Sequence, residues 1–570
     1  MRGVARTPPL AALLVLVMAA CQTVTPSGGP EGSAASPRPT ASGGAATTFD
    51  HRVGIRTVGG RTELFDRQTN QPFAPRGANY LHLERDSSGV VVDRLFAAYD
   101  GDTASADLAD MQRLGYTSVR IALDICQGDC IGDPAGGLRT DYLANVADLL
   151  RRAQAIGLPV LLQSNDLPVN GGYVSRVEAT GGSEFDGYLN SQYLSPTGVE
   201  VYREYWRDVI DGLKSAGAPL GAVLAWNVRG EIFVVDDKPP LSLRSGSVTT
   251  ANGRTYDMAS AKERATMVRD GLVYWVDEMA AIIRSADPNA IIAIGEFAPN
   301  SPTAWRGKDP RSPPRIDVLL GSSVDVLDVH VYPGYVPLVK LMENLGVTGD
   351  EPIPVIVGEY GAFTFAFSDP PAGAAGLMQW QVESCRFGID GWFHWHWRGV
   401  GDAEVWTGTE AENAINTTLS PAERPDPCVT RDFPFLRQNL ALGAKVTASS
   451  SVAGQGSKLA IDGDPGTSWV SGKAPPGWIE ISLGRPSTIE TIRLTVNQSP
   501  PGRTVHTVSA GGSHASLEKV HVFDGATKYG DLLSWTPSAP LTGVSVIRIQ
   551  TSVSPSWVAW LEIEIVGRPD

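Results

Sequence analysis

The feature that most constrains the fold is a series of short apolar runs that alternate with helical segments. The runs cover residues 73–79, 116–123, 158–163, 222–227, 290–294, 324–331, 352–361 and 391–397. Short apolar runs between turn-forming residues are typical of strands buried on both faces of a parallel sheet. Eight such units predict an α/β fold, a (β/α)8 TIM barrel, over residues 49–437. Long segments after the third and fourth runs, 164–194 and 231–257, are expected to build a cleft.

A different pattern begins near residue 438. Short alternating runs at 480–483, 489–496, 519–523, 544–551 and 560–566 are separated by Gly, Pro, Asn and Ser. Alternation with frequent turn residues is typical of antiparallel strands that bury one face. Residues 438–570 are therefore predicted to form a separate all-β sandwich.

The N-terminus has the pattern of an export signal. Arg2 and Arg6 precede an apolar run at 10–17, and small residues lead to Cys21. The segment 18–21 resembles a bacterial lipobox, so residues 1–21 are expected to be a lipoprotein signal peptide with Cys21 acylated. Cleavage at an ordinary Ala-x-Ala site is the alternative. Residues 22–48 are rich in Gly, Ser, Ala, Thr and Pro and predict a flexible linker. The protein is expected to be extracytoplasmic and lipid-anchored to the cell membrane, or secreted.

The net charge limits the possible binding partners, and the expected compartment limits the state of the cysteines. Lys and Arg total 47 against 62 Asp and Glu, a net charge of −15, which argues against nucleic acid as a partner. Outside the cytoplasm, cysteines pair. The expected disulfides are Cys126 with Cys130, which are four residues apart, and Cys385 with Cys428. A zinc site competes with this interpretation, although no His lies at ligand spacing.

Two carboxylates end predicted barrel strands. Glu231 follows the fourth run, and Glu359 closes the seventh. The carboxyl ends of barrel strands carry the chemistry in this fold, and these two strands lie across the barrel mouth. A facing pair of carboxylates suits the cleavage of a glycosidic bond, because one can protonate the leaving oxygen while the other attacks or activates water. Other polar and aromatic residues at strand ends are Arg120, His330, Tyr332 and Trp397.

With these residues the barrel resembles the cellulase-like retaining β-glycosidases, most closely glycoside hydrolase family 5. The resemblance implies that Glu231 is the acid/base and Glu359 the nucleophile. It also implies that Arg120, His330, Tyr332 and Trp397 contact the substrate, with Tyr332 or Arg120 orienting the nucleophile. The implied protein is a tethered, monomeric enzyme that hydrolyses a β-linked poly- or oligosaccharide without a catalytic cofactor.

Two positions depart from the family pattern. Gly230 stands where the family has Asn before the acid/base, and residues 163–166 read Gln-Ser-Asn-Asp where the family often has His. In the related enzymes that Asn contacts the sugar 2-hydroxyl. Asn165 is the expected substitute. The missing side chain at Gly230 further suggests a substrate modified, inverted or crowded at its 2-position.

The last module resembles the discoidin, or coagulation-factor type C, carbohydrate-binding sandwich. The matching segments are 439–441, 448–450, 461–464, 467–469, 478–480 and 483–484. The resemblance implies a structural calcium ion held by Asp462, Asp464, Thr467 and Glu562, which are hard oxygen ligands. Trp469 and Trp478 are expected in the core, and the candidate sugar contacts are Arg503, His506 and Trp557.

The same residues are compatible with two other functions. A non-catalytic glycan-binding lipoprotein would use Trp397, Trp406 and the long loops to hold a glycan. A transglycosylase would have the same sequence features. The two facing carboxylates favour an enzyme, because a binding-only site gains nothing from them.

Overall fold

The computed structural model describes residues 50–85, 91–124, 131–179, 184–185, 187–297, 311–334, 336–364, 366–399, 405–428, 438–464 and 466–570. Cys21, Cys126, Cys130 and the predicted linker 22–48 lie outside the described residues. In the part of the chain that is described, no helix is both long and apolar enough to cross a membrane.

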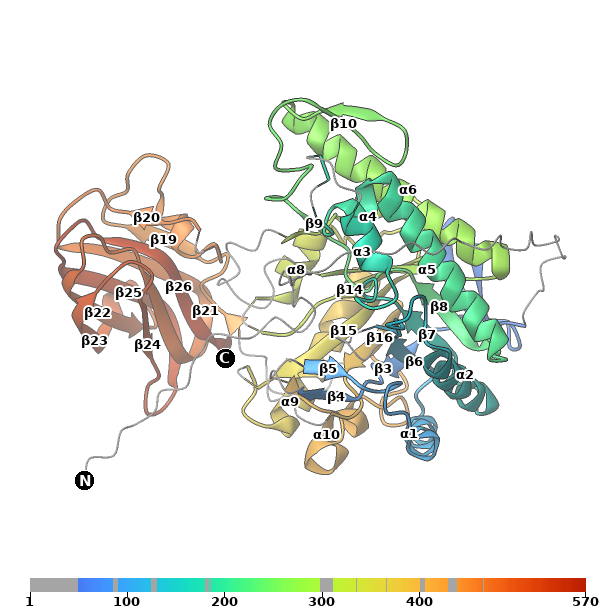
Figure 1. Cartoon of the computed structure of the whole chain (residues 1–570). Coiled ribbons are helices and arrows are strands. Elements are labelled where there is room, and N and C mark those ends of the chain that lie inside the picture. The colour runs from blue at the N-terminus through green and yellow to red at the C-terminus, as the bar shows by residue number, and fades with distance from the viewer. Residues whose placement is uncertain are drawn as a thin grey trace, which may run out of the picture.

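The first part of the chain is a parallel barrel (Figure 1). Within the described residues it has eight strands: β3 (Arg76–Ala78), β6 (Val119–Ala122), β7 (Val160–Gln163), β8 (Val223–Asn227), β12 (Ile292–Phe297), β14 (Val326–His330), β15 (Val355–Phe363) and β16 (Gly391–Trp395). The ladder runs from β6 through β7, β8, β12, β14, β15 and β16 to β3. Hydrogen bonds from Thr117 N to Arg76 O (2.9 Å) and from Tyr80 N to Arg120 O (2.8 Å) close the circle. Each predicted run overlaps one barrel strand, so the TIM barrel is confirmed.

Helices surround the strands. They are α1 (Gly101–Arg113), α2 (Thr140–Ala155), α5 (Pro196–Ser215), α6 (Ala261–Ala286), α7 (Ile316–Leu319), α8 (Leu338–Leu345), α9 (Pro370–Ser384) and α10 (Glu410–Thr418). Side-chain caps start several of them: Ser195 accepts from Gly198 N ahead of α5, and Ser260 accepts from Glu263 N ahead of α6. Trp206 of α5 and Trp275 of α6 are fully buried. These apolar faces hold the helices on the barrel.

Smaller elements close the barrel's two ends. The hairpin of β1 (Val53–Val58) and β2 (Arg61–Asp66) packs on the side chains that fill the barrel interior. The long segments after β7 and β8 hold α3 (Tyr173–Glu178), α4 (Ser191–Leu194), β9 (Val234–Val235), β10 (Ser247–Thr249) and β11 (Thr255–Asp257). The remaining short strands are β4 (Leu83–Arg85), β5 (Val91–Asp93), β13 (Arg311–Ser312) and β17 (Val405–Trp406).

The second part is an antiparallel sandwich with its own core. Its strands are β18 (Gln438–Asn439), β19 (Lys445–Ala448), β20 (Trp469–Val470), β21 (Gly477–Val496), β22 (Gly502–Gly511), β23 (Glu518–Thr527), β24 (Leu532–Trp535), β25 (Leu541–Val553) and β26 (Ala559–Pro569). Trp469 and Trp560 are fully buried among Ile and Val side chains, as expected for Trp469. The core prediction is wrong for Trp478, which is partly exposed beneath the guanidinium of Arg548, 4.5 Å from its ring centroid.

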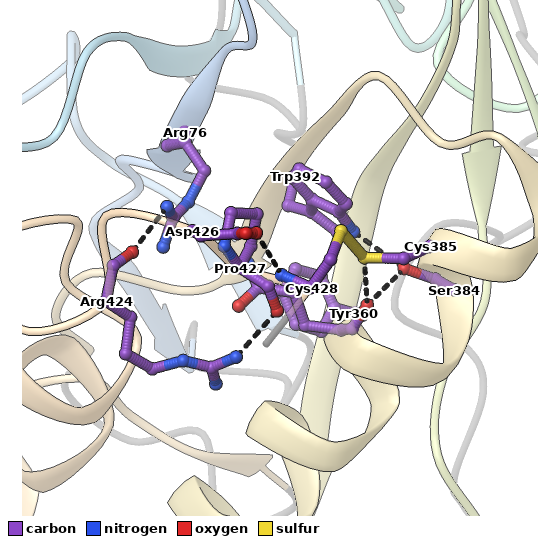
Figure 2. The surroundings of a disulfide bond; sticks show 10 residues. Arg76, Tyr360, Ser384, Cys385, Trp392, Arg424, Asp426, Pro427 and Cys428 are labelled. Atoms are coloured by element: carbon purple, nitrogen blue, oxygen red, sulfur yellow. Dashed lines mark hydrogen bonds between the residues drawn. A yellow bond between two sulfur atoms is a disulfide. The ribbon is translucent and has the colours of Figure 1, made fainter. Parts of the chain in front are cut away.

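A disulfide joins the C-terminal end of the barrel domain to the end of helix α9. Cys385, directly after α9, bonds to Cys428 across 43 residues, as predicted (Figure 2). Next to it, Trp392 Nε1 donates to Ser384 Oγ at 2.7 Å. On the other side, Arg424 Nη2 donates to the carbonyl of Pro427 at 2.7 Å. Cys385 precedes β16, so the bridge lies at the N-terminal end of the strands, opposite the face that carries the carboxylates.

Candidate active site

Four of the sequence-predicted residues meet at the carboxyl ends of the barrel strands. Arg120 lies on β6, His330 ends β14, Glu359 lies on β15, and Glu231 follows β8 by four residues. Parallel strands bring their carboxyl ends to one face, so residues far apart in sequence become neighbours. A carboxylate oxygen of Glu231, one of Glu359 and a ring nitrogen of His330 all lie within 4.8 Å of one another.

Glu359 is held by two donors. Arg120 Nη1 donates to its Oε1 at 2.8 Å, and the hydroxyl of Tyr332 donates to its Oε2 at 2.9 Å. The Glu359 residue is only 6% exposed. Burial and the charge of Glu359 raise the pKa of Tyr332 well above its usual value, so the phenol keeps its proton as a donor. Arg120 and Tyr332 therefore both hold the Glu359 carboxyl group, where the resemblance implied that one or the other orients it.

His330 lies between the two carboxylates. Its Nδ1 is 3.0 Å from Glu231 Oε1 and 3.4 Å from Glu359 Oε2. Burial alone would lower the pKa of His330, but Glu359 and Asp328 outweigh it and raise the pKa to about 10. The Nδ1 proton is thus available to Glu231.

Asp328 is a buried member of this network that the sequence reasoning missed. It is fully buried on β14, with Arg120 Nη2 at 3.2 Å and Asn227 Nδ2 donating at 2.8 Å. Burial raises the pKa of Asp328, but Arg120 and His330 reverse this and hold it below its usual value. The signal was in the sequence: Asp328 and His330 are two residues apart on one strand and so share a face.

The space beside Gly230 is filled. A Cβ atom on Gly230 would meet the side-chain amides of Gln163 and Asn165, with Gln163 Cδ only 2.6 Å away. The expectation of free room for a crowded sugar 2-position is therefore wrong. The two amides come from the end of β7 and its loop, and Gln163 Nε2 donates to Asn165 Oδ1.

The structure does not place Trp397 with this group. Trp397 is 1% exposed, its indole N–H donates to Asp107 at 3.3 Å, and its ring packs edge-on against Tyr116. The reason is that β16 ends at Trp395, so the strand alternation that would aim Trp397 at the cleft has already stopped. Trp397 is a core residue in this structure, and the prediction that it contacts substrate is wrong here.

Arg229 was also missed. It is 1% exposed, its Nε donates to the main-chain carbonyl of Glu231 at 3.1 Å, and its Nη1 lies 3.3 Å from Asp166 Oδ1. The guanidinium also lies 5.8 Å from the ring centroid of Phe233. A buried cation two residues before Glu231 thus joins the loop after β8 to the loop after β7.

In the sandwich, the four predicted calcium ligands lie on one loop and the strand beside it. Thr467 Oγ1 donates to Asp462 Oδ2 at 3.0 Å, and Asp464 N donates to Asp462 Oδ1 at 3.0 Å. Glu562 of β26 is 1% exposed and accepts from Gly463 N at 3.2 Å. Its other oxygen, Oε1, is buried without a partner among the described residues. Burial and the Asp462 and Glu564 carboxylates raise the pKa of Glu562 to about 10.

The three candidate sugar contacts in the sandwich differ in their exposure to solvent. His506 is 4% exposed, with Nδ1 2.8 Å from Thr551 Oγ1 and its ring against Trp560, so its prediction as a surface contact is wrong. Arg503 is exposed and pairs with Asp524 at 2.9 Å. Trp557 is 55% exposed in the turn between β25 and β26.

Comparison with known proteins gives one family match, to the C-terminal part of the chain. Residues 445–563 match the family model described as the F5/8 type C domain. The chain has no match among curated proteins. Among solved structures it is similar to an endo-1,4-beta-mannanase from Rhizomucor miehei, at 18% identity and TM-score 0.45, over 65% of this chain and 100% of that chain.

Two further solved structures are similar in part. The exo-beta-1,4-mannosidase Op5Man5 from Opitutaceae bacterium strain TAV5 is 16% identical, with TM-score 0.42, over 66% of this chain and 64% of that chain. The family 32 carbohydrate-binding module of NanJ from C. perfringens, solved with galactose, is 16% identical, with TM-score 0.21, over 23% of this chain and 99% of that one. The chain joins a (β/α)8 barrel to a C-terminal F5/8 type C domain.

Proposed function

We propose that the protein is a retaining β-glycosidase that hydrolyses a β-linked poly- or oligosaccharide by double displacement. The observation that carries the proposal is the pair of carboxylates Glu231 and Glu359 at the barrel mouth, with oxygens within 4.8 Å of each other. Retaining enzymes have carboxyl groups about 5–5.5 Å apart, whereas inverting enzymes need about 6.5–9.5 Å to admit a water molecule. The short spacing favours retention.

In the first step Glu359 attacks the anomeric carbon while Glu231 gives its proton to the leaving oxygen. Arg120 and Tyr332 hold both Glu359 oxygens at 2.8 and 2.9 Å, which orients the carboxylate for attack. In the second step Glu231, now a carboxylate, takes a proton from water, and the water attacks the glycosyl ester. The Nδ1–H of His330, 3.0 Å from Glu231, stabilises that carboxylate between the steps.

Replacing either carboxylate by its amide tests the proposal. Glu359→Gln and Glu231→Gln are each expected to lower turnover of the best β-glycan by about three orders of magnitude or more, roughly 4 kcal/mol, while the protein remains folded. Turnover is measured by reducing-end release across a panel of polysaccharides. Wild-type rates in both variants would contradict the proposal. Glycan binding without turnover by the wild type would support the non-catalytic alternative.

For the C-terminal domain we propose calcium as a structural ion and a glycan as its ligand. The buried, unpartnered Oε1 of Glu562 beside Asp462, Asp464 and Thr467 suits a hard cation with oxygen ligands. Exposed Trp557 offers an aromatic face of the kind that stacks on sugars.

We further propose that the lipobox-like segment ending at Cys21 anchors the protein outside the cell.

A further inference from the structure

We propose that the side-chain amide of Asn165 donates a hydrogen bond to the hydroxyl next to the anomeric carbon of the bound sugar, a role that residue 230 cannot fill. The substrate class is then a β-pyranoside with a free 2-hydroxyl. The inference rests on the proposed glycosidase function. It adds a residue on the loop after β7 to the site formed by Glu231 and Glu359.

The Asn165 amide is fixed directly against the segment that carries Glu231. A Cβ on Gly230 would collide with Asn165 Oδ1 and with the amide of Gln163, so the Asn165 side chain lies in contact with Gly230. Gln163 Nε2 donates to Asn165 Oδ1, which uses the acceptor end of the Asn165 amide. Gln163 itself is fully buried.

The donor end of Asn165 is left for a ligand. Among the described residues, Asn165 Nδ2 has no hydrogen-bond partner. The residue as a whole is only 5% exposed, but Nδ2 is not among the polar atoms that are shut off from solvent without a partner. An amide N–H is a strong donor, and a donor left unpaired in a dry site costs free energy. A sugar hydroxyl at the barrel mouth would satisfy it.

The backbone beneath this amide is rigid. Asn165 N donates to Asp124 Oδ1 at 2.6 Å, and Ser164 Oγ donates to Asp124 Oδ2 at 2.7 Å. Gly230 N donates to Ser164 O at 2.7 Å, which joins this loop directly to the one that carries Glu231. Asn165 is therefore positioned before substrate arrives, as a transition-state contact requires.

The location identifies the hydroxyl. In a retaining site the anomeric carbon faces Glu359 and the leaving oxygen faces Glu231. The Asn165 side chain contacts residue 230, which is next in the chain to Glu231. The 2-hydroxyl is the hydroxyl on the carbon bonded to the anomeric carbon. Hydrogen bonds to the 2-hydroxyl strengthen in the transition state of glycosidases.

The test compares kcat/KM for 4-nitrophenyl β-D-glucopyranoside, β-D-mannopyranoside and their shared 2-deoxy analogue. Removing O2 from either sugar gives the same compound, so one reference serves both. For the faster hydroxylated sugar, the wild type is expected to prefer the hydroxyl by about a hundredfold, ~2.7 kcal/mol. Asn165→Ala is expected to reduce that preference at least tenfold.

Asn165→Asp separates donor from acceptor, because a carboxylate keeps the shape of the amide and can only accept. It is expected to lose the preference as Asn165→Ala does. Gly230→Ala, which pushes a Cβ into the amide pair, should reduce the preference without deleting Asn165. The matched control is Asn145→Ala on α2, which removes an amide that donates to the Phe96 carbonyl. This variant should keep the preference.

Glu359→Gln is measured in parallel, so that a failure of the Asn165 proposal can be distinguished from a failure of the proposed glycosidase function. A wild-type hydroxyl preference in both Asn165→Ala and Asn165→Asp, with Glu359→Gln inactive, would overturn the role of Asn165 and leave the glycosidase function intact. Full activity in Glu359→Gln would overturn both.

Discussion

Single residues at the barrel mouth balance one another's charge. Arg120 contacts the carboxylates of Glu359 and Asp328, at 2.8 and 3.2 Å, and is itself 1% exposed. His330 lies beside Glu231, with its Nδ1 3.0 Å from Glu231 Oε1. Removing one partner of such a buried pair leaves an uncompensated charge and typically costs about 3–5 kcal/mol. The residues that hold the Glu359 carboxyl group are therefore also part of what keeps the barrel folded.

Glu296 is the opposite case, a buried carboxyl with no partner. It lies on β12, is fully buried, and neither side-chain oxygen has a hydrogen-bond partner among the described residues. Burial, helped by the Asp317 carboxylate, raises its pKa well above the usual value. Below about pH 4.5 the folded and unfolded states are both protonated. At higher pH the unfolded state releases its proton while the folded state retains it, so this group makes the protein less stable as pH rises.

Glu296→Gln is therefore expected to raise the melting temperature at pH 7 and to leave it unchanged at pH 4. The gain at neutral pH is the cost of keeping the buried carboxyl protonated in the folded state. Thermal unfolding across pH 4–8 measures it. Glu343→Gln, at a side chain that is 63% exposed, is the matched control and should show no such gain. An equal melting temperature for wild type and Glu296→Gln at pH 7 would contradict this account.

At the scale of elements, the strands could be predicted because each carries its own signal in a few adjacent residues. The eight apolar runs specify the barrel strands, and the residues at their ends, Arg120, His330 and Glu359, come together because parallel strands share one face. The disulfide between Cys385 and Cys428 could be predicted by elimination. These parts of the fold and site depend on local pattern and on one topological rule.

What could not be predicted depends on contacts between elements. The space at Gly230 is taken by amides from the neighbouring strand, which no local pattern reveals. Trp397 was misplaced because β16 ends two residues earlier. His506 was placed on the surface, yet its ring packs on Trp560 inside the sandwich. Each error concerns where a strand ends or what fills the space beside it.

The calcium loop of the sandwich gives a prediction at this scale. Calcium is expected to raise the sandwich's melting transition in the full chain by on the order of 5–10 °C at a hundredfold excess over its Kd. Asp462→Ala is expected to abolish the shift, because this carboxylate bonds Thr467 and lies beside Glu562. Asp524→Ala, an exposed carboxylate in the same domain, should retain it. A calorimetric profile that is the same in calcium and in chelator would contradict the site.

For the whole molecule, the barrel and the sandwich each have a separate hydrophobic core, so each is expected to unfold as its own unit. The Cys385–Cys428 bond closes a 43-residue segment that includes β16 and α10, the last strand and helix of the barrel. Constraining a loop of that length in the unfolded state stabilises the folded state by up to about 4 kcal/mol.

The double variant Cys385→Ala, Cys428→Ala is thus expected to lower the barrel's melting temperature and to leave the sandwich's transition in place. Differential scanning calorimetry with and without reductant measures both. The reductant should lower the barrel transition of wild type at least as far as the double variant does, because it would also open the expected Cys126–Cys130 bond. An unchanged barrel transition in wild type after complete reduction would contradict this role.

In the proposed mechanism Glu359 forms a covalent bond to the sugar, and that bond can be trapped. A 2,4-dinitrophenyl 2-deoxy-2-fluoro-β-glycoside of the preferred configuration reacts once and leaves a slowly hydrolysed glycosyl ester, which mass spectrometry of proteolytic peptides locates. We expect one added 2-deoxy-2-fluoroglycosyl group, on the peptide that contains Glu359, and none in Glu359→Gln. Labelling of another residue, or turnover that releases product of inverted anomeric configuration without any adduct, would contradict it.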